Sequence, residues 1–107
     1  GDFPLWLAPE QARVIPVKED FAQYGLEVKN LLLNSGIRAE IDSRNETLNK
    51  RIRQAELEKA PYILVVGQRE AEAKTVTVRK RHDQDQQSLA VSDFIEKIKE
   101  EITRKVP

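Results

Sequence analysis

The amino-acid sequence predicts a single α/β domain in which three helices flank a mixed sheet of about five strands. Residues 62–66, Tyr-Ile-Leu-Val-Val, form a continuous apolar run closed by Gly67, which is typical of a strand buried on both faces. Before this run, strand and helix patterns alternate, which implies parallel pairing through right-handed crossovers. After it, short links join the remaining strands, which implies an antiparallel part.

The first half of the chain is predicted to supply two strands and one helix. Residues 12–17 have the composition of a strand, with Pro16 at its end or at a sheet edge. Apolar residues then recur at spacings of three and four between residues 21 and 32, which predicts an amphipathic helix. Gly36 is a natural left-handed stop for that helix. Residues 37–41 alternate apolar and polar side chains, which predicts a second strand.

A second helix and a polar connection surround the buried strand. The helix is expected from about residue 47 to residue 58, and Pro61 prevents it from continuing. Residues 68–74 are predicted to be a polar link that leads to another strand. That strand begins at residues 75–78 and ends in the basic residues 79–81.

Both ends of the chain are also assigned from composition. Residues 82–87 are predicted to be a polar turn, residues 88–90 a short edge strand, and residues 91–105 a closing helix. At the N-terminus, two prolines oppose regular helix, so the segment is predicted to be extended. Its large apolar residues, Phe3 and Trp6, pack either onto the domain or onto a partner domain.

Composition limits the possible functions. The chain has 107 residues, of which 39% are hydrophobic and 34% are charged, and this fits one globular domain. No apolar run reaches the roughly 18–20 residues of a membrane span. The absence of cysteine excludes disulfides and is compatible with a cytoplasmic location. The net charge of zero argues against a nucleic-acid binder that uses its whole surface, but residues 74–82 carry four basic side chains and no acid.

No pattern in the sequence supports catalysis by this chain. The four glycines are scattered, so there is no phosphate-binding loop, and no serine lies in a nucleophile motif. His82, the only histidine, adjoins Asp83 and Asp85, but these residues favour a solvated turn over a metal site. We therefore expect neither a metal nor another cofactor in this chain.

Basic residues near the buried strand are the candidates for binding. Arg79 and Arg81 alternate along a strand and would share one face, with Lys80 on the other. The remaining candidates lie at or near the start of the second helix: Arg44, Lys50, Arg51 and Arg53. From these residues alone, both a solvated surface and a binding patch remain open.

Several segments, in order, resemble the C-terminal anticodon-binding domain of threonyl-tRNA synthetases. The matching segments are residues 3–11 (Phe-Pro-Leu-Trp-Leu-Ala-Pro-Glu-Gln), 34–38 (Asn-Ser-Gly-Ile-Arg), 42–46 (Asp-Ser-Arg-Asn-Glu), 61–67 (Pro-Tyr-Ile-Leu-Val-Val-Gly) and 75–81 (Thr-Val-Thr-Val-Arg-Lys-Arg). The first and third favour the threonyl enzyme over its prolyl, histidyl and glycyl relatives, which share the fold. The sequence departs from the family at Asn49, where many relatives have glycine, and at residues 82–83, where they often have Gly-Gly.

The resemblance implies a domain that binds the anticodon of threonine tRNA, whose second and third bases are G and U. It implies base contacts from four positions: Asn45, Lys59, Glu70 and Arg79. A carboxylate can accept the N1–H and N2–H donors of guanine, and an arginine can bond to two base acceptors. The other basic residues are expected to hold the RNA backbone: Arg44, Lys50, Arg51, Arg53 and Arg81.

Two functions from different classes follow as hypotheses. In the first, residues 12–107 are the anticodon-binding domain of a threonine–tRNA ligase, and residues 1–11 lead in as an extended segment from a catalytic domain outside this sequence. Its partners would be that domain and the threonine tRNA anticodon loop, with no membrane and no DNA. ATP, magnesium and zinc would belong to the parent enzyme. In the second, the same fold serves as a non-catalytic interaction or dimerisation module of an accessory protein.

Overall fold

The computed structural model describes residues 3–80 and 85–105, and its five strands form one mixed sheet with the spatial order β2-β1-β3-β4-β5. The strands are β1 (Ala12–Pro16), β2 (Ala39–Ile41), β3 (Tyr62–Val66), β4 (Thr75–Lys80) and β5 (Gln86–Ala90). Strand β1 pairs in parallel with both β2 and β3, whereas β4 runs antiparallel to β3 and to β5. The predicted mixed sheet, parallel first and antiparallel afterwards, is confirmed.

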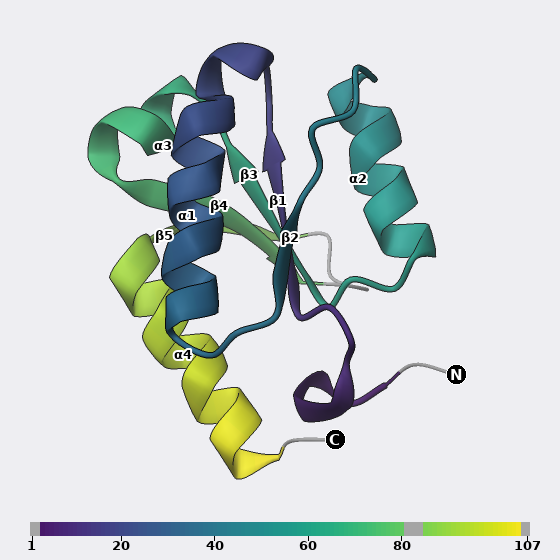
Figure 1. Ribbon diagram of the computed structural model, residues 1–107, viewed down its shortest axis with the longest axis vertical. Helices are drawn as coiled ribbons and strands as arrows, with labels where there is room; N and C mark the ends of the chain where they lie inside the picture. The colour runs from purple at the N-terminus through teal and green to yellow at the C-terminus, as the bar shows by residue number, and fades with distance from the viewer. Residues whose placement is uncertain (1–2, 81–84, 106–107) are drawn as a thin grey trace.

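Helices cover both faces of this sheet. The α-helices are α1 (Ala22–Asn34), α2 (Leu48–Leu57), α3 (Gln68–Ala73) and α4 (Val91–Arg104), and the short 3-10 helices are η1 (Leu5–Leu7) and η2 (Glu19–Phe21). Helices α1 and α4 pack on one face and α2 on the other (Figure 1). The described residues therefore contain four α-helices, not the three that were predicted.

The additional helix, α3, occupies the segment that was predicted to be a polar link. Its first turn is closed at Gly67, whose N–H donates to the Glu70 carboxylate and whose carbonyl accepts from the N–H of Ala71. It ends at Lys74, which is left-handed with φ 58°. Ala71 alone packs against the main core, so the segment shows no apolar periodicity from which a helix could be predicted.

The N-terminal segment also differs from the prediction, because residues 5–7 form η1 where an extended chain was expected. Leu5 is buried, and the buried Gln11 amide donates to its carbonyl at 3.1 Å. The Lys105 ammonium lies 5.3 Å from the centre of the Trp6 ring, whereas Phe3 is 60% exposed. Trp6 therefore contacts the domain itself, whereas the side chain of Phe3 stays exposed.

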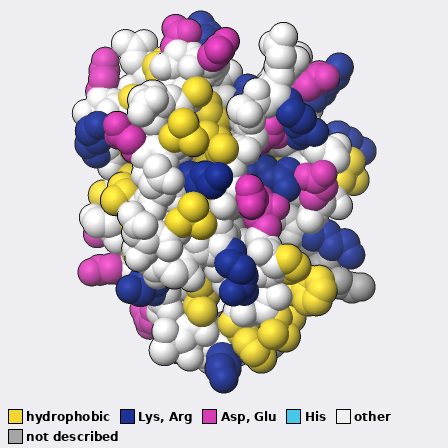
Figure 2. Space-filling view, viewed as in Figure 1, with side chains coloured by type: hydrophobic (Ala, Val, Ile, Leu, Met, Phe, Trp, Pro, Cys, Tyr) yellow, Lys and Arg dark blue, Asp and Glu magenta, His cyan; other side chains and the backbone are white. Residues whose placement is uncertain are grey.

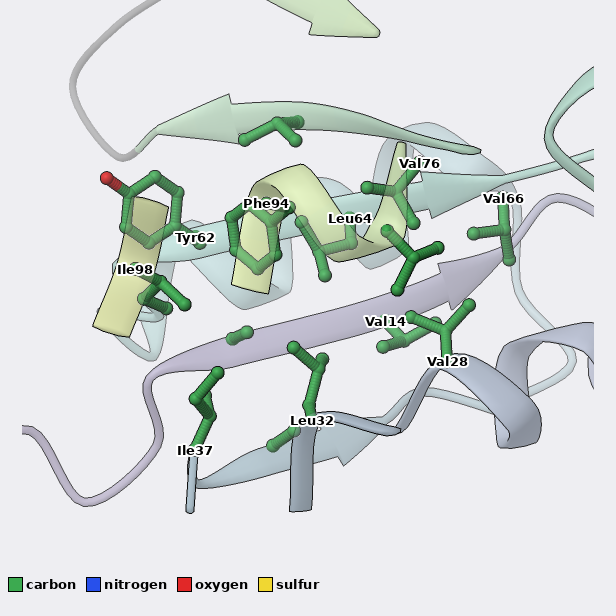
Figure 3. Close-up of a cluster of buried hydrophobic side chains, with 14 of the residues drawn as sticks. Val14, Val28, Leu32, Ile37, Tyr62, Leu64, Val66, Val76, Phe94 and Ile98 are labelled. Atoms are coloured by element: carbon green, nitrogen blue, oxygen red, sulfur yellow. The ribbon is translucent and has the colours of Figure 1, made fainter. Parts of the chain in front are cut away.

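The main core lies between the sheet and the helices α1 and α4 (Figure 3). Val28 and Leu32 of α1 and Phe94 and Ile98 of α4 are fully buried there. The rings of Tyr62 and Phe94 meet edge to face with their centroids 5.4 Å apart, which is a favoured aromatic geometry. This core fixes the position of β3 in the sheet.

A second, smaller core lies under α2. It consists of Ile15 of β1, Ile63 of β3, Ile52 and Ala55 of α2, and Ala60. These contacts hold α2 over β1 and β3. They do not extend to β4 and β5, so this helix leaves part of its sheet face uncovered.

The structure confirms the predicted stop at the end of α1 and adds a cap at the start of α2 that was not predicted. Gly36 has φ 82°, the left-handed conformation that was predicted for the end of α1. The Thr47 hydroxyl accepts from the N–H of Lys50 at 3.2 Å and caps the start of α2. This cap fixes where α2 begins, directly after the loop that carries Asn45.

Candidate nucleic-acid interface

The uncovered part of the sheet is a row of polar side chains on β4 and β5, on the same side as α2. Arg79 lies directly opposite Ile63, which packs under α2, so the two side chains share a face. Alternation along β4 places Thr75 and Thr77 on that face, while Val76 and Val78 enter the main core. On β5, Ser88 pairs with Thr77, and Gln86 pairs with Arg79. We call the surface of Thr75, Thr77, Arg79, Gln86 and Ser88 the open face.

Glu70 lies at one end of the open face. Its Oε1 accepts from the Gly67 N–H at 2.6 Å, and its Oε2 accepts from the Thr77 hydroxyl at 3.3 Å. Glu70, Thr75, Thr77 and Ser88, with neighbouring residues of α3, line a cavity of about 510 Å³. The sequence suggested an exposed loop acid, but the structure gives a half-buried helical carboxylate that faces a cavity.

Arg79 is the next side chain along the same face of β4. Two residues along a strand span roughly 6–7 Å, so Arg79 lies close to the Glu70–Thr77 pair. Its side chain is 21% exposed, and its Nη2 lies 3.9 Å from the Glu56 carboxylate of α2. Its buried Nε has no hydrogen-bond partner among the residues that the structure describes. Since buried polar atoms are normally paired, this N–H is an exception, a donor of Arg79 that the described part of the protein leaves unsatisfied.

Asn45 and Lys59 lie at opposite ends of α2. Asn45 is exposed in the loop between β2 and α2, and with Arg44, Val17 and other residues it lines a cavity of about 630 Å³. Because parallel strands end at one edge of the sheet, this loop and the Gly67–Glu70 turn share that edge. Lys59 follows the C-terminal end of α2, is exposed and has φ 65°. The structure thus brings Glu70 and Arg79 together on the open face and places Asn45 and Lys59 at the two ends of α2.

Three of the expected backbone-binding residues are exposed. The Arg44 guanidinium holds Asp42 through contacts of 2.6 Å and 3.1 Å. Lys50 lies 3.7 Å from the Glu46 carboxylate, and Arg53 is exposed on α2. Arg81 lies outside the described residues, as do His82 and Asp83.

Arg51 corrects the prediction, because it is buried with 5% exposure. Its guanidinium donates to the carbonyls of Pro16 at 2.6 Å, Val17 at 3.1 Å and Glu46 at 3.1 Å. Its donors are directed at backbone carbonyls, so it joins the end of β1 to the loop before α2. Arg51 is therefore a structural residue and not a phosphate contact.

Asp42 is the buried acid of the loop between β2 and α2. Burial alone would raise the pKa of its carboxyl group, but the hydrogen bonds and charge of Arg44, with the nearby charge of Arg51, hold that pKa below its ordinary value. A carboxylate at this position accepts from the Arg44 backbone N–H at 3.0 Å. The loop that carries Asn45 is therefore ordered by two arginines and one buried acid.

Acidic and basic side chains are interspersed on the face seen in Figure 2, with no continuous basic surface. Within residues 3–80 and 85–105, no group of three His, Asp or Glu side chains could hold a metal ion. No helix in the described part of the chain has the length and hydropathy needed to cross a bilayer. The open face itself is a small polar surface on a chain whose net charge is zero.

The sequence patterns did not mark Thr77, Glu56 or Ser88 as functional residues. The alternation of Thr and Val before Arg79 contained the signal for Thr77, because it predicts that residues 75, 77 and 79 share a face. No local pattern pairs Glu56 with Arg79, which is 23 residues away, or aligns Ser88 with Thr77.

Comparison with known proteins places this geometry in a family. The family model described as "Anticodon binding domain" matches residues 11–101. The chain is 48% identical over 105 residues to a threonine–tRNA ligase of Sulfurihydrogenibium sp., covering 98% of this chain and 16% of that protein. It is also 48% identical over 98 residues to the Thermococcus sibiricus threonine–tRNA ligase, covering 92% of this chain and 16% of that protein.

Solved structures agree. The RNA binding domain of threonyl-tRNA synthetase from Cryptosporidium parvum matches with a TM-score of 0.89 and 35% identity, covering 94% of this chain and 25% of that chain. Prolyl-tRNA synthetase of the same organism matches with a TM-score of 0.84 and 25% identity, covering 96% and 22%. The family model spans most of the chain and the fold agrees with its relatives, so this chain belongs to the anticodon binding domain family and is homologous to the domain found in threonine–tRNA ligases.

Proposed function

We propose that this chain recognises the anticodon loop of threonine tRNA as one domain of a threonine–tRNA ligase. The observation that carries the proposal is the side-by-side placement of Glu70 and Arg79 at the open face, with the Arg79 Nε lacking an acceptor among the described residues. The relatives support the choice of tRNA. ATP-dependent aminoacylation would take place in the rest of the ligase, since this chain spans 16% of those relatives.

The donors and acceptors of the open face suit single-stranded bases. A carboxylate has about four lone-pair sites, of which Gly67 and Thr77 occupy two on Glu70. The two that remain can accept the N1–H and N2–H donors of guanine, the second base of a threonine anticodon. The planar Arg79 guanidinium supplies donors to base acceptors such as O6 and N7 of guanine or the carbonyls of uracil.

The remaining residues take supporting roles in this proposal. Asn45 and Lys59 flank α2 and would contact the anticodon from either end of that helix. Arg44, Lys50 and Arg53 would hold phosphates, together with Arg81. We assign ATP, magnesium and zinc to the rest of the ligase, and we propose that the chain acts in the cytoplasm, without a membrane or DNA partner.

The test is a binding titration of variants against stem-loops that carry either the threonine anticodon or one with its G or U changed. Glu70→Ala and Arg79→Ala should narrow the affinity gap between matched and mismatched loops, because removing one good base contact costs about 1–3 kcal/mol. Lys50→Ala is the control and should weaken the binding of both stem-loops by the same factor. Equal weakening of all loops by both Glu70→Ala and Arg79→Ala would disprove recognition of bases by these residues.

The second candidate, an interaction module, rests on apolar side chains that α1 leaves exposed. Leu26, Leu31 and Leu33 are each more than two-fifths exposed on this helix. A protein partner could bury them. If Glu70 and Arg79 variants leave base discrimination unchanged while Leu26→Glu disrupts self-association measured by sedimentation, the interaction module replaces the anticodon domain as the proposal.

A further inference from the structure

Two donors from different elements hold the carboxylate of Glu70. The Gly67 N–H, at the start of α3, donates to Oε1 at 2.6 Å, and the Thr77 hydroxyl, from β4, donates to Oε2 at 3.3 Å. The first contact is local to the helix start and is three residues away in sequence. The second joins the helix to the sheet, and within the described residues it is the only hydrogen bond between Glu70 and the open face.

Thr77 is suited to setting the orientation of another side chain. Its backbone is fixed in the sheet between Val65 and Ser88. A β-branched side chain in a strand has few accessible χ1 rotamers, so the direction of its hydroxyl is restricted. The hydroxyl has a single proton, and this proton is directed to Glu70.

We propose that Thr77 is a positioning residue for base recognition, which rests on the proposed function above. Glutamate has three rotatable side-chain bonds, and fixing them when RNA binds costs affinity. With Oε1 held by Gly67 and Oε2 held by Thr77, the plane of the carboxylate is set before RNA arrives. The free lone pairs then point to one edge of one base, which converts a flexible acid into a selective acceptor.

The surroundings of this pair provide space for a ligand. The cavity of about 510 Å³ beside Glu70 has Thr75, Thr77 and Ser88 on its floor. Its volume is within the range of about 300–1,000 Å³ that accommodates small molecules. Its lining is rich in hydroxyl groups and carries the Glu70 carboxylate, which suits the polar edge of a guanine.

The experiment compares guanine with inosine at the middle anticodon position of a threonine anticodon stem-loop. Inosine lacks only the 2-amino group, so the affinity ratio of the two loops reports the N2–H contact to the carboxylate. We expect the unmodified 107-residue chain to prefer guanine about tenfold, the lower end of a good base contact. Thr77→Val, which keeps the shape but removes the hydroxyl, should reduce the ratio to roughly twofold to threefold.

Two variants serve as matched controls. Thr77→Ser retains a hydroxyl and should retain most of the preference for guanine. Thr103→Val makes the same substitution at an exposed position of α4, outside the cavity and the open face, and it should leave the ratio unchanged. Thermal unfolding of all three variants shows whether each remains folded, and the ratio is interpreted only with a folded chain.

The outcomes separate the two proposals. If Glu70→Ala abolishes the preference for guanine but Thr77→Val keeps it, the positioning role is overturned and anticodon recognition stands. If Thr77→Val weakens the binding of both loops by the same factor, the hydroxyl holds RNA directly or supports the fold, and the positioning role is again overturned. If the unmodified chain shows no preference, both proposals fail. If Thr77→Val unfolds, loss of the ratio in Thr77→Ser overturns the proposal and its retention supports it.

Discussion

Arg51 and Arg79 differ in the acceptors that surround them. Arg51 donates to three backbone carbonyls and is almost fully buried. Arg79 has one carboxylate neighbour at 3.9 Å, and its buried Nε has no hydrogen-bond partner within the described ranges. A guanidinium stays charged and carries five N–H donors, so its role depends on how many donors the protein satisfies. The first arginine therefore stabilises the fold, and the second keeps an unsatisfied donor, which supports its proposed role in RNA binding.

The structural role of Arg51 leads to a prediction about stability. Arg51→Ala should lower the free energy of unfolding by about 2–4 kcal/mol, because buried carbonyls lose hydrogen bonds to a charged group. Arg53→Ala, two residues away and exposed, should change it by no more than about 0.5 kcal/mol. Urea unfolding followed by circular dichroism measures both. Equal midpoints for Arg51→Ala and the unmodified chain would contradict the structural assignment.

Asp42 gives a prediction about pH. Because its pKa in the folded chain lies below its ordinary value of 3.8, the folded state binds this proton less readily than the unfolded state. Asp42 therefore stabilises the fold above its unfolded pKa, and this contribution is lost as the pH falls through the folded value. The difference in unfolding free energy between the unmodified chain and Asp42→Asn should be constant near neutral pH and shrink below about pH 4. A difference that grows on acidification would reverse the assignment.

At the scale of elements, the sequence was most informative where burial was strongest. The apolar run 62–66 is β3 residue for residue, and the spacing from residue 21 to residue 32 falls on α1. Helix α3 was missed because only Ala71 packs inward and the helix depends on a hydrogen bond from Gly67 to Glu70. The strand predicted at residues 88–90 is longer, spanning residues 86–90, since Gln86 and Gln87 pair with β4 although both are exposed.

The sequence patterns predicted the candidate site less well than the fold. Family motifs, and not periodicity, marked Glu70 and Arg79. Their proximity depends on antiparallel pairing of β4 with β3 and on α3 turning Glu70 back over Thr77. Arg51 was misassigned because a basic residue in a polar helix usually faces solvent, and only the tertiary position of the carbonyls of residues 16 and 17 buries it.

Two lysines that follow helix ends allow an effect on stability to be distinguished from an effect on RNA binding. Lys59 follows α2, Lys74 follows α3, and both have positive φ, 65° and 58°, which strains a residue with a Cβ. Lys59→Gly and Lys74→Gly should each raise the free energy of unfolding by roughly 0.5–1 kcal/mol. Only Lys59→Gly should also weaken binding of the anticodon stem-loop. Urea unfolding and RNA titration of the same preparations test this, and parallel loss of RNA affinity in both variants would contradict the role of Lys59.

At the scale of the whole molecule, electrostatic attraction to RNA is limited. The 18 basic and 18 acidic residues cancel, and they are interspersed on the visible face (Figure 2). The cations around the start of α2 are largely compensated, because Arg44 holds Asp42, Lys50 lies near Glu46, and Arg51 is buried. Selectivity in such a domain depends on base contacts more than on the phosphate backbone.

The last prediction is therefore a weak dependence of RNA binding on salt. Each phosphate neutralised on a single strand contributes about 0.7 to the slope of log affinity against log salt, and the four proposed phosphate contacts give a slope of about −3. Lys50→Ala should flatten the slope by about 0.7, whereas Glu70→Ala should lower the affinity and leave the slope unchanged. Fluorescence titration of a labelled threonine anticodon stem-loop between about 50 and 200 mM salt measures all three slopes. A slope of about −5 or steeper in the unmodified chain would mean that backbone contacts dominate and that Glu70 and Arg79 do not carry recognition.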